Sequence, residues 1–155
     1  ITLPVLLMMF MRTDNPHEHE DFFLKILPCT IVFSIWINDT MAYIVGSFIG
    51  KNPLSKISPK KTWEGTLGGI ILAVLVIALI GSATGYYSLT DWIVIPIICA
   101  AFGTFGDLLE SKIKRMASVK DSGTLMPGHG GFLDRFDSLL IAIPFVFLYY
   151  LLFMR

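Results

Sequence analysis

Two aspartates stand three residues apart near the C-terminus, in the segment Leu-Asp-Arg-Phe-Asp that ends at Asp137. In a helix this spacing places the carboxylates of Asp134 and Asp137 on one face, one turn apart. Paired carboxylates that face phosphates typically hold Mg²⁺, a hard cation whose coordination is completed by phosphate oxygens of a substrate. Two such ions can stabilise the attacking and the leaving oxygen of an in-line displacement. The pair therefore predicts phosphate chemistry assisted by divalent cations.

The segment before this pair adds a glycine-rich turn and several cations. The turn Gly128-His129-Gly130-Gly131 lets the backbone approach a ligand and aim its amides at an anion. The side chains that could neutralise phosphates are Lys114, Arg115, Lys120 and Arg135. A loop that only carried the positive charge of a cytoplasmic face would explain these cations, but not the acidic residues and the glycines beside them. The segment 111–137 is therefore interpreted as an active-site loop.

Two further carboxylates, Asp39 and Asp107, lie within or at the end of long apolar runs. An ionisable side chain at the centre of a membrane helix costs at least ~2.5–3.5 kcal/mol, so it is a functional candidate by default. Asp107 would be a third metal ligand if its helix packs beside the helix of Asp134. Glu110 and Ser111 would share its helical face. The alternatives remain open: Asp107 could cap a helix, and Asp39 could make a buried hydrogen bond.

A second basic segment reads Ser58-Pro59-Lys60-Lys61-Thr62-Trp63-Glu64-Gly65. Ser-Pro begins a turn, the lysines reach towards anions, and tryptophan suits the level of the lipid headgroups. Alone, the segment could anchor the protein to anionic lipids. Beside the first loop, it could form the other wall of a phosphate site.

The composition shows what must position these groups. Hydrophobic residues make up 54% of the 155-residue chain and charged residues only 15%, where a soluble domain has about 25% charged residues. The apolar residues form five blocks, and a helix needs ~20 residues to cross the hydrocarbon layer. Blocks of this length are too long for barrel strands. The predicted fold is all-α, a polytopic transmembrane helical bundle, with helices at about 1–11 (partial), 22–48, 66–85, 89–108 and 138–154.

We expect residues 1–155 to form one transmembrane catalytic domain. Because the chain begins with Ile1 inside an apolar run, we expect it to be a fragment that lacks N-terminal helices. Nine of the twelve basic residues fall in the loops 51–65 and 110–136. One crossing per block puts both loops on the same side, which the positive-inside rule identifies as cytoplasmic. In a bacterium, the membrane would be the inner one.

With these segments laid out, the sequence resembles the C-terminal half of a CDP-diacylglycerol synthase (phosphatidate cytidylyltransferase). Residues 111–137 match without a gap the family pattern S-x-hydrophobic-K-R-x₄-K-D-x-small-x₂-hydrophobic-P/G-x-H-G-G-hydrophobic-x-D-R-hydrophobic-D. Met126 is the one soft departure, since the family usually has Leu, Ile or Phe there. Segments 38–43 and 58–65 also resemble the family, so the likeness spans about Asp39 to Asp137.

The resemblance implies that CTP and phosphatidic acid react to give CDP-diacylglycerol and pyrophosphate, with Mg²⁺ required and a second ion of open identity. It implies no nucleic-acid partner, and it leaves a homodimer open. The expected metal ligands are Asp107 and Asp134, with Asp137 and Asp39 as further or supporting ligands. The expected catalytic residues are Asp107, Asp134, Asp137, Lys120, Asp121 and His129. The expected substrate-binding residues are Lys60, Lys61, Glu64, Ser111, Lys114, Arg115, Gly130, Gly131 and Arg135.

Two alternative functions also use aspartates at or within a membrane. A CDP-alcohol phosphotransferase also uses aspartates and Mg²⁺ at a membrane face, but its D-x₂-D-G-x₂-A-R pattern does not occur in the sequence. A transporter or channel could use Asp39 and Asp107 as ion ligands within the membrane. Transport would give flux without CTP, whereas the enzyme would release pyrophosphate only with CTP, phosphatidic acid and Mg²⁺ together.

Overall fold

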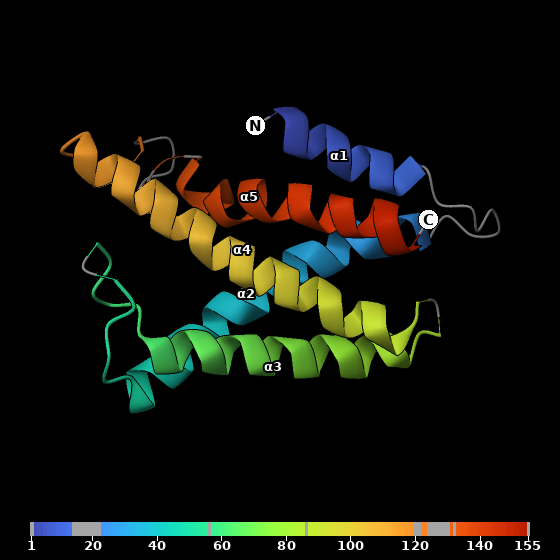
Figure 1. The fold of residues 1–155 in the computed structure, drawn as a ribbon, viewed down its shortest axis with the longest axis horizontal. Coiled ribbons are helices and arrows are strands. Elements are labelled where there is room, and N and C mark those ends of the chain that lie inside the picture. Colours follow the sequence, from blue (N-terminus) through green and yellow to red (C-terminus); the bar gives the residue numbers. More distant parts are fainter. Residues whose placement is uncertain are drawn as a thin grey trace.

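The computed structural model describes residues 2–13, 23–55, 57–85, 87–119, 122–123, 131 and 133–154; of residues 12, 13, 23–25, 133 and 135 it describes the backbone alone. The described chain is helical, and its only β-type pairing is an isolated bridge between Pro53 and Thr62. The elements are α1 (Thr2–Thr13), α2 (Phe23–Ile49), α3 (Trp63–Ser82), α4 (Leu89–Met116), α5 (Leu133–Tyr149) and the π-helical turn η1 (Tyr150–Met154) (Figure 1).

Four of these helices contain stretches long and apolar enough to cross a membrane: Ile26–Ile49, Trp63–Ser82, Leu89–Met116 and Phe136–Met154. Outward-facing side chains on these helices are large and apolar; Ile71 and Leu79 of α3, for example, are more than 60% exposed. Such a surface is suited to lipid rather than to water. The predicted all-α, polytopic membrane bundle is confirmed.

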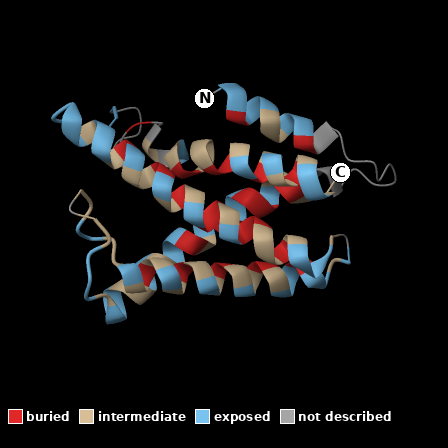
Figure 2. Cartoon of the chain, in the orientation of Figure 1, coloured by how far each residue is buried: buried red, intermediate tan, exposed pale blue. Residues whose placement is uncertain are grey.

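Helix α4 crosses the middle of the bundle and contacts α2, α3 and α5, while α2 packs along α3 and α5 along α4 (Figure 1). Buried residues follow the sides on which these helices face one another (Figure 2). The core joins Leu27 and Ile31 of α2, Ile95 of α4, and Ile143 and Val146 of α5. This apolar core holds α4 and α5 side by side, which matters because both carry carboxylates at the same end.

Helix α3 buries one narrow stripe at four-residue spacing, formed by Gly65, Gly69, Ala73, Ile77 and Gly81. Small residues let membrane helices approach closely and gain van der Waals contact where no hydrophobic effect drives association. A Cβ atom on Gly69 would lie 2.8 Å from the Ala42 Cβ and 2.8 Å from the Asn38 carbonyl oxygen. The close pairing of α2 with α3 therefore depends on glycine at position 69, which has no Cβ to collide with α2.

The helix ends differ from the predicted ones in an informative way. Helix α4 continues to Met116, eight residues past the expected end at Leu108, and α5 begins at Leu133, five residues before the expected start. Hydropathy marks only the part of a helix that lies in lipid, whereas the hydrogen-bonded backbone continues until a residue ends it. Ser118, with a positive φ of 57°, ends α4, and the Val119 amide donates to the Lys114 carbonyl. Ser111, Lys114 and Arg115 therefore lie on a helix, where a loop was expected.

We expect Gly69→Ala to lower the melting temperature of the purified protein, because overpacking of a tight contact costs about 1–3 kcal/mol. Gly103→Ala is the matched control. Its added Cβ would lie 3.5 Å from the Ser138 Cβ, an ordinary contact, so its melting temperature should be equal or higher. Thermal unfolding in one detergent would compare the two. Equal melting temperatures would contradict the close packing of α2 on α3.

Candidate active site at one end of the bundle

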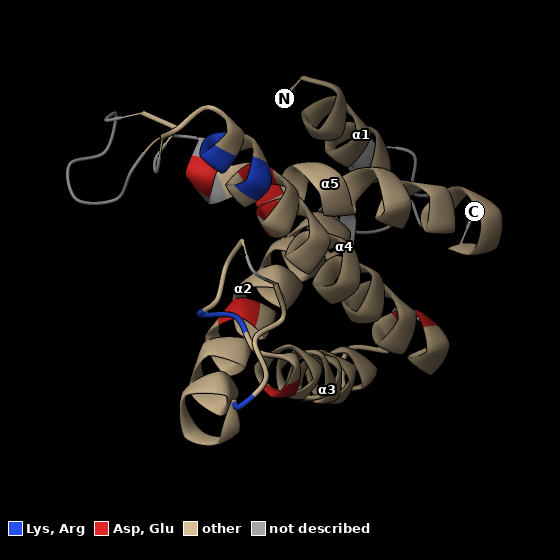
Figure 3. Cartoon of the chain, turned by 60° about the vertical axis from the view of Figure 1, so that its left-hand side comes forward, with Lys and Arg blue, Asp and Glu red and all other residues tan. Residues whose placement is uncertain are grey.

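Charged residues gather at one end of the bundle, where α4 ends, α5 begins and the loop between α2 and α3 lies alongside (Figure 3). The loop reaches α4 through Lys61, whose ammonium forms a salt bridge with the Asp107 carboxylate. The two basic segments of the sequence therefore meet at the same end, as one membrane crossing per apolar block requires.

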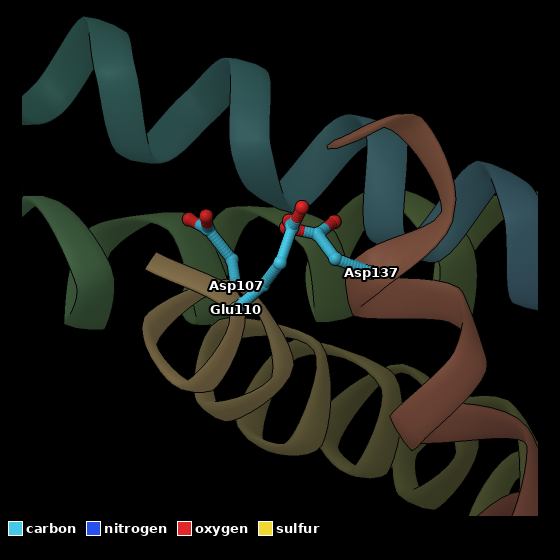
Figure 4. Close-up of side chains that lie close together, drawn as sticks. All are labelled: Asp107, Glu110 and Asp137. Atoms are coloured by element: carbon cyan, nitrogen blue, oxygen red, sulfur yellow. The ribbon is translucent and has the colours of Figure 1, made fainter. Parts of the chain in front are cut away.

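Three carboxylates from two helices form the centre of this end. Asp107 and Glu110 lie one turn apart on α4, and Asp137 comes from the first turns of α5 (Figure 4). One oxygen of each lies within 4.8 Å of the others. Gly106 makes this approach possible, because a Cβ there would lie 2.8 Å from the Asp137 carbonyl oxygen. The arrangement of donor atoms is one that a hard divalent cation prefers.

Glu110 is the most unusual member of this carboxylate cluster. Glu110 is 7% exposed, and neither of its side-chain oxygens accepts a hydrogen bond from any described residue. Among the described residues, the cation that pairs with Glu110 is Lys114, whose ammonium lies 3.5 Å from Oε1. A buried carboxylate without hydrogen bonds is costly, so its environment calls for a positive partner. From the sequence Glu110 was expected only to share the face of Asp107. The three-residue spacing from Asp107 was the signal that it could join the cluster.

Asp134 is held in a different way. Its Oδ1 accepts a hydrogen bond from the Lys114 ammonium at 2.7 Å, and its Oδ2 accepts from the backbone amides of Ser122 at 2.9 Å and Gly131 at 2.7 Å. Burial raises the pKa of Asp134, but these hydrogen bonds outweigh burial and hold the pKa well below its usual range. Asp134 is thus ionised and lies next to the cluster, joined to Glu110 through Lys114. Its role as a metal ligand stays a prediction.

Asp39 lines two cavities. The first, of about 350 Å³, is named the polar cavity because most of its lining residues have polar side chains: Asn38, Asp39, Ala42, Tyr43, Ser58, Lys60, Lys61, Thr62, Thr66, Thr104 and Asp107. The second, of about 360 Å³, is lined by Val32, Ile35, Trp36, Asp39, Asp134, Phe136, Asp137, Ser138 and Leu139. One cavity therefore offers ammonium and hydroxyl groups, and the other joins carboxylates to an apolar wall.

Burial lowers the pKa of the Lys61 ammonium from its ordinary value, and the carboxylates of Asp39 and Asp137 raise it only part of the way back. A partly desolvated ammonium interacts more strongly with an anion than one in open water. Lys61 is therefore well placed to attract a phosphate that enters the first cavity.

The remaining predicted site residues fall into three groups. Glu64 faces the base of the α2–α3 loop, where it accepts hydrogen bonds from Lys51 and Asn52. On α4, Ser111 is half-buried and Arg115 is exposed. Lys120, Asp121, His129, Gly130 and the side chain of Arg135 lie outside the described residues, so their predicted roles stay predictions.

Comparison with known proteins decides the family. A family model described as "Cytidylyltransferase family" matches residues 1–153. The chain belongs to the cytidylyltransferase family. The resemblance seen in residues 111–137 is thereby confirmed across nearly the whole sequence.

Individual relatives in this cytidylyltransferase family carry the name phosphatidate cytidylyltransferase. The protein of Haemophilus influenzae is 40% identical over 141 residues, which cover 86% of this chain and 49% of the relative. The protein of Bacillus subtilis is 48% identical over 121 residues, 76% of this chain and 44% of the relative. The protein of Staphylococcus saprophyticus is 46% identical over 113 residues, which cover 71% of this chain and 43% of the relative. The chain spans about half the length of the curated relatives it matches.

Lys114→Met should lower the melting temperature markedly, because it removes the cation between Asp134 and Glu110. Breaking a fully buried ion pair costs about 3–5 kcal/mol, since the remaining charge is left unpaired; the pair of Lys114 with Asp134 is part-buried, so its loss should cost less. Lys112→Met is the matched control: Lys112 lies on the same helix, is exposed and forms no ion pair with a described residue. The double variant Lys114→Met/Asp134→Asn should recover part of the loss. Equal melting temperatures for the two single variants would show that Lys114 does not stabilise Asp134 and Glu110.

Proposed function

We propose that this chain forms the catalytic part of a phosphatidate cytidylyltransferase. In the reaction, a phosphate oxygen of phosphatidic acid attacks the α-phosphorus of CTP and forms a new P–O bond. The bond from that phosphorus to the oxygen bridging it to the β-phosphorus breaks, and pyrophosphate leaves with its electron pair. The observation that carries the proposal is the cluster of Asp107, Glu110 and Asp137 beside a cavity lined by Lys60 and Lys61. The names of the relatives support it.

The reaction requires little proton transfer by the protein. The attacking phosphate oxygen is already ionised at neutral pH, so a strong general base is unnecessary. Catalysis can come from holding the two substrates in line and from neutralising the charge that they carry. Lys60 and Lys61 supply positive charge in the polar cavity. Lys114 supplies it beside Asp134 and Glu110.

We propose that Asp107, Glu110 and Asp137 hold a Mg²⁺ ion. The residues fit the ion, because all three donors are carboxylates and the two Glu110 oxygens accept no hydrogen bond from the described residues. Bound there, Mg²⁺ would supply positive charge to substrate phosphates. Asp39 and Asp134 are the candidates for a second ion, since both line the neighbouring cavity. Keeping Asp107, Glu110 and Asp137 compact without a cation would be costly, since like charges at short range repel.

The second cavity suits a lipid phosphate better than a free one. Val32, Trp36 and Leu139 give it an apolar wall, and Trp36 is 66% exposed on the outer side of α2. Asp137 also lines this cavity and belongs to the carboxylate cluster. A phosphatidic acid molecule could therefore keep its acyl chains against apolar side chains while its phosphate approaches the cations.

Orientation follows from the distribution of charge. Because both basic segments lie at the active-site end, the positive-inside rule favours a cytoplasmic location for that end, at the inner membrane if the protein is bacterial. CTP would then reach the site from the cytoplasm and phosphatidic acid from the bilayer. A homodimer stays a prediction.

The direct test uses the full-length protein in liposomes and measures pyrophosphate release. We expect release only when CTP, phosphatidic acid and Mg²⁺ are all present, and we expect CDP-diacylglycerol as the lipid product. Omission of phosphatidic acid or Mg²⁺ should abolish the release of pyrophosphate. Ion flux without CTP, and no pyrophosphate with it, would favour the transporter alternative and contradict the proposal.

Glu110→Gln and Asp137→Asn should each lower kcat by about 100-fold or more, in the range seen when charge-stabilising groups are lost from active sites. Both substitutions nearly preserve shape, so the protein should still fold. Asp91→Asn is the control, because Asp91 caps the opposite end of α4 and accepts a hydrogen bond from Tyr149. It should lower thermal stability with little effect on kcat. Near-normal turnover of the Glu110 variant would remove that residue from the proposed metal site.

A further inference from the structure

The loop between α2 and α3 must be held firmly if it is to present its lysines to α4. It spans residues 50–62 and carries Lys60 and Lys61 into the polar cavity, where Lys61 meets Asp107. Lysine side chains have many rotamers and a loop of this length has many paths, so an ordered contact needs support from the backbone. The structure shows what supplies that support.

Glu64, in the first turn of α3, binds the start of this loop with both of its carboxylate oxygens. Oε2 accepts from the backbone amides of Lys51 at 3.3 Å and Asn52 at 3.2 Å, and Oε1 accepts from the Asn52 side-chain amide at 2.7 Å. Neither Glu64 nor Asn52 is among the described residues that line the polar cavity. The carboxylate therefore acts on the loop and not on a molecule in the cavity.

The effect of this clamp passes along the loop to Lys61 through backbone pairing. The Trp63 amide donates to the Asn52 carbonyl at 3.0 Å, and the Leu54 amide donates to the Lys61 carbonyl at 2.7 Å. Pro53 and Thr62 form an antiparallel bridge between these two hydrogen bonds. The clamped segment and the segment that carries Lys61 are thus joined by one isolated antiparallel bridge and two flanking hydrogen bonds, so the position of one sets the register of the other.

We propose that Glu64 is a positioning residue for the proposed reaction: by clamping Lys51 and Asn52 it sets the register that places Lys61 against Asp107. The inference rests on the proposed function, because Lys61 is taken to bind substrate phosphate. The role differs from the direct substrate contact expected from the sequence. A carboxylate in the first turn of a helix could instead serve only the helix dipole, and that simpler role would affect stability alone.

A double-mutant cycle separates these roles. Glu64→Gln replaces one acceptor oxygen with an NH₂ group that faces N–H donors, so the clamp opens. We expect kcat/KM for CTP to fall about tenfold or more, as when residues that orient catalytic ligands are removed. Lys61→Ala should cost at least as much, and the double variant should be no worse than Lys61→Ala alone. If the losses of kcat/KM in the two single variants multiplied in the double variant, the proposal would be overturned. A Glu64 variant that is less stable but has unchanged kcat/KM would also overturn it.

Lys51→Ala is the matched control, because Glu64 binds the backbone amide of Lys51 and not its side chain. It should leave both the kinetics and the loop unchanged. Hydrogen exchange gives a second readout that needs no activity: Glu64→Gln should accelerate exchange of the Leu54 amide, whereas Lys51→Ala should not. If the unmodified protein released no pyrophosphate, the proposed function would fail, and the exchange data would still decide the clamp. Unchanged exchange at Leu54 in Glu64→Gln would overturn it.

Discussion

Carboxylates brought together at the edge of a membrane repel one another and lose solvation, so they persist only where positive charge compensates them. Asp107, Glu110 and Asp137 are placed in this way, within 4.8 Å of one another. Cations approach from two sides: Lys61 pairs with Asp107, and Lys114 lies between Glu110 and Asp134. Much of this end of the molecule can be understood as the means of holding these opposite charges in register.

The apolar part of the bundle serves this arrangement. Gly106 lets α4 approach α5 closely enough for Asp137 to join Asp107 and Glu110. The narrow glycine-rich stripe of α3 brings α2 and α3 together, so that the loop joining them ends beside α4. Thr62 then caps α3 by accepting a hydrogen bond from the Gly65 amide, directly after Lys61. The position of Lys61 therefore depends on both the packing and the capping of α3.

Much of this architecture could be predicted from the sequence, because a membrane demands long apolar blocks and allows few charges within them. The same demand made Asp107 stand out, and the spacing of Asp134 and Asp137 placed both near the start of α5. Side-chain partners could not be predicted in this way. Asp134 was expected to bind a metal ion directly. The sequence did not show that its oxygens accept hydrogen bonds from the Lys114 ammonium and from the backbone amides of Ser122 and Gly131. Nor could the hydrogen bonds that Glu64 accepts from Asn52 be predicted, and its expected contact with substrate stays a prediction.

The most direct test of the account is to locate a divalent cation. Crystals of the full-length protein grown with Mn²⁺ in place of Mg²⁺, together with CTP, would give an anomalous difference map at the manganese edge. The account predicts a peak within bonding distance of oxygens from Asp107, Glu110 and Asp137. A peak confined to other residues, with Lys61 still paired to Asp107, would contradict the proposal that these three carboxylates form the metal site.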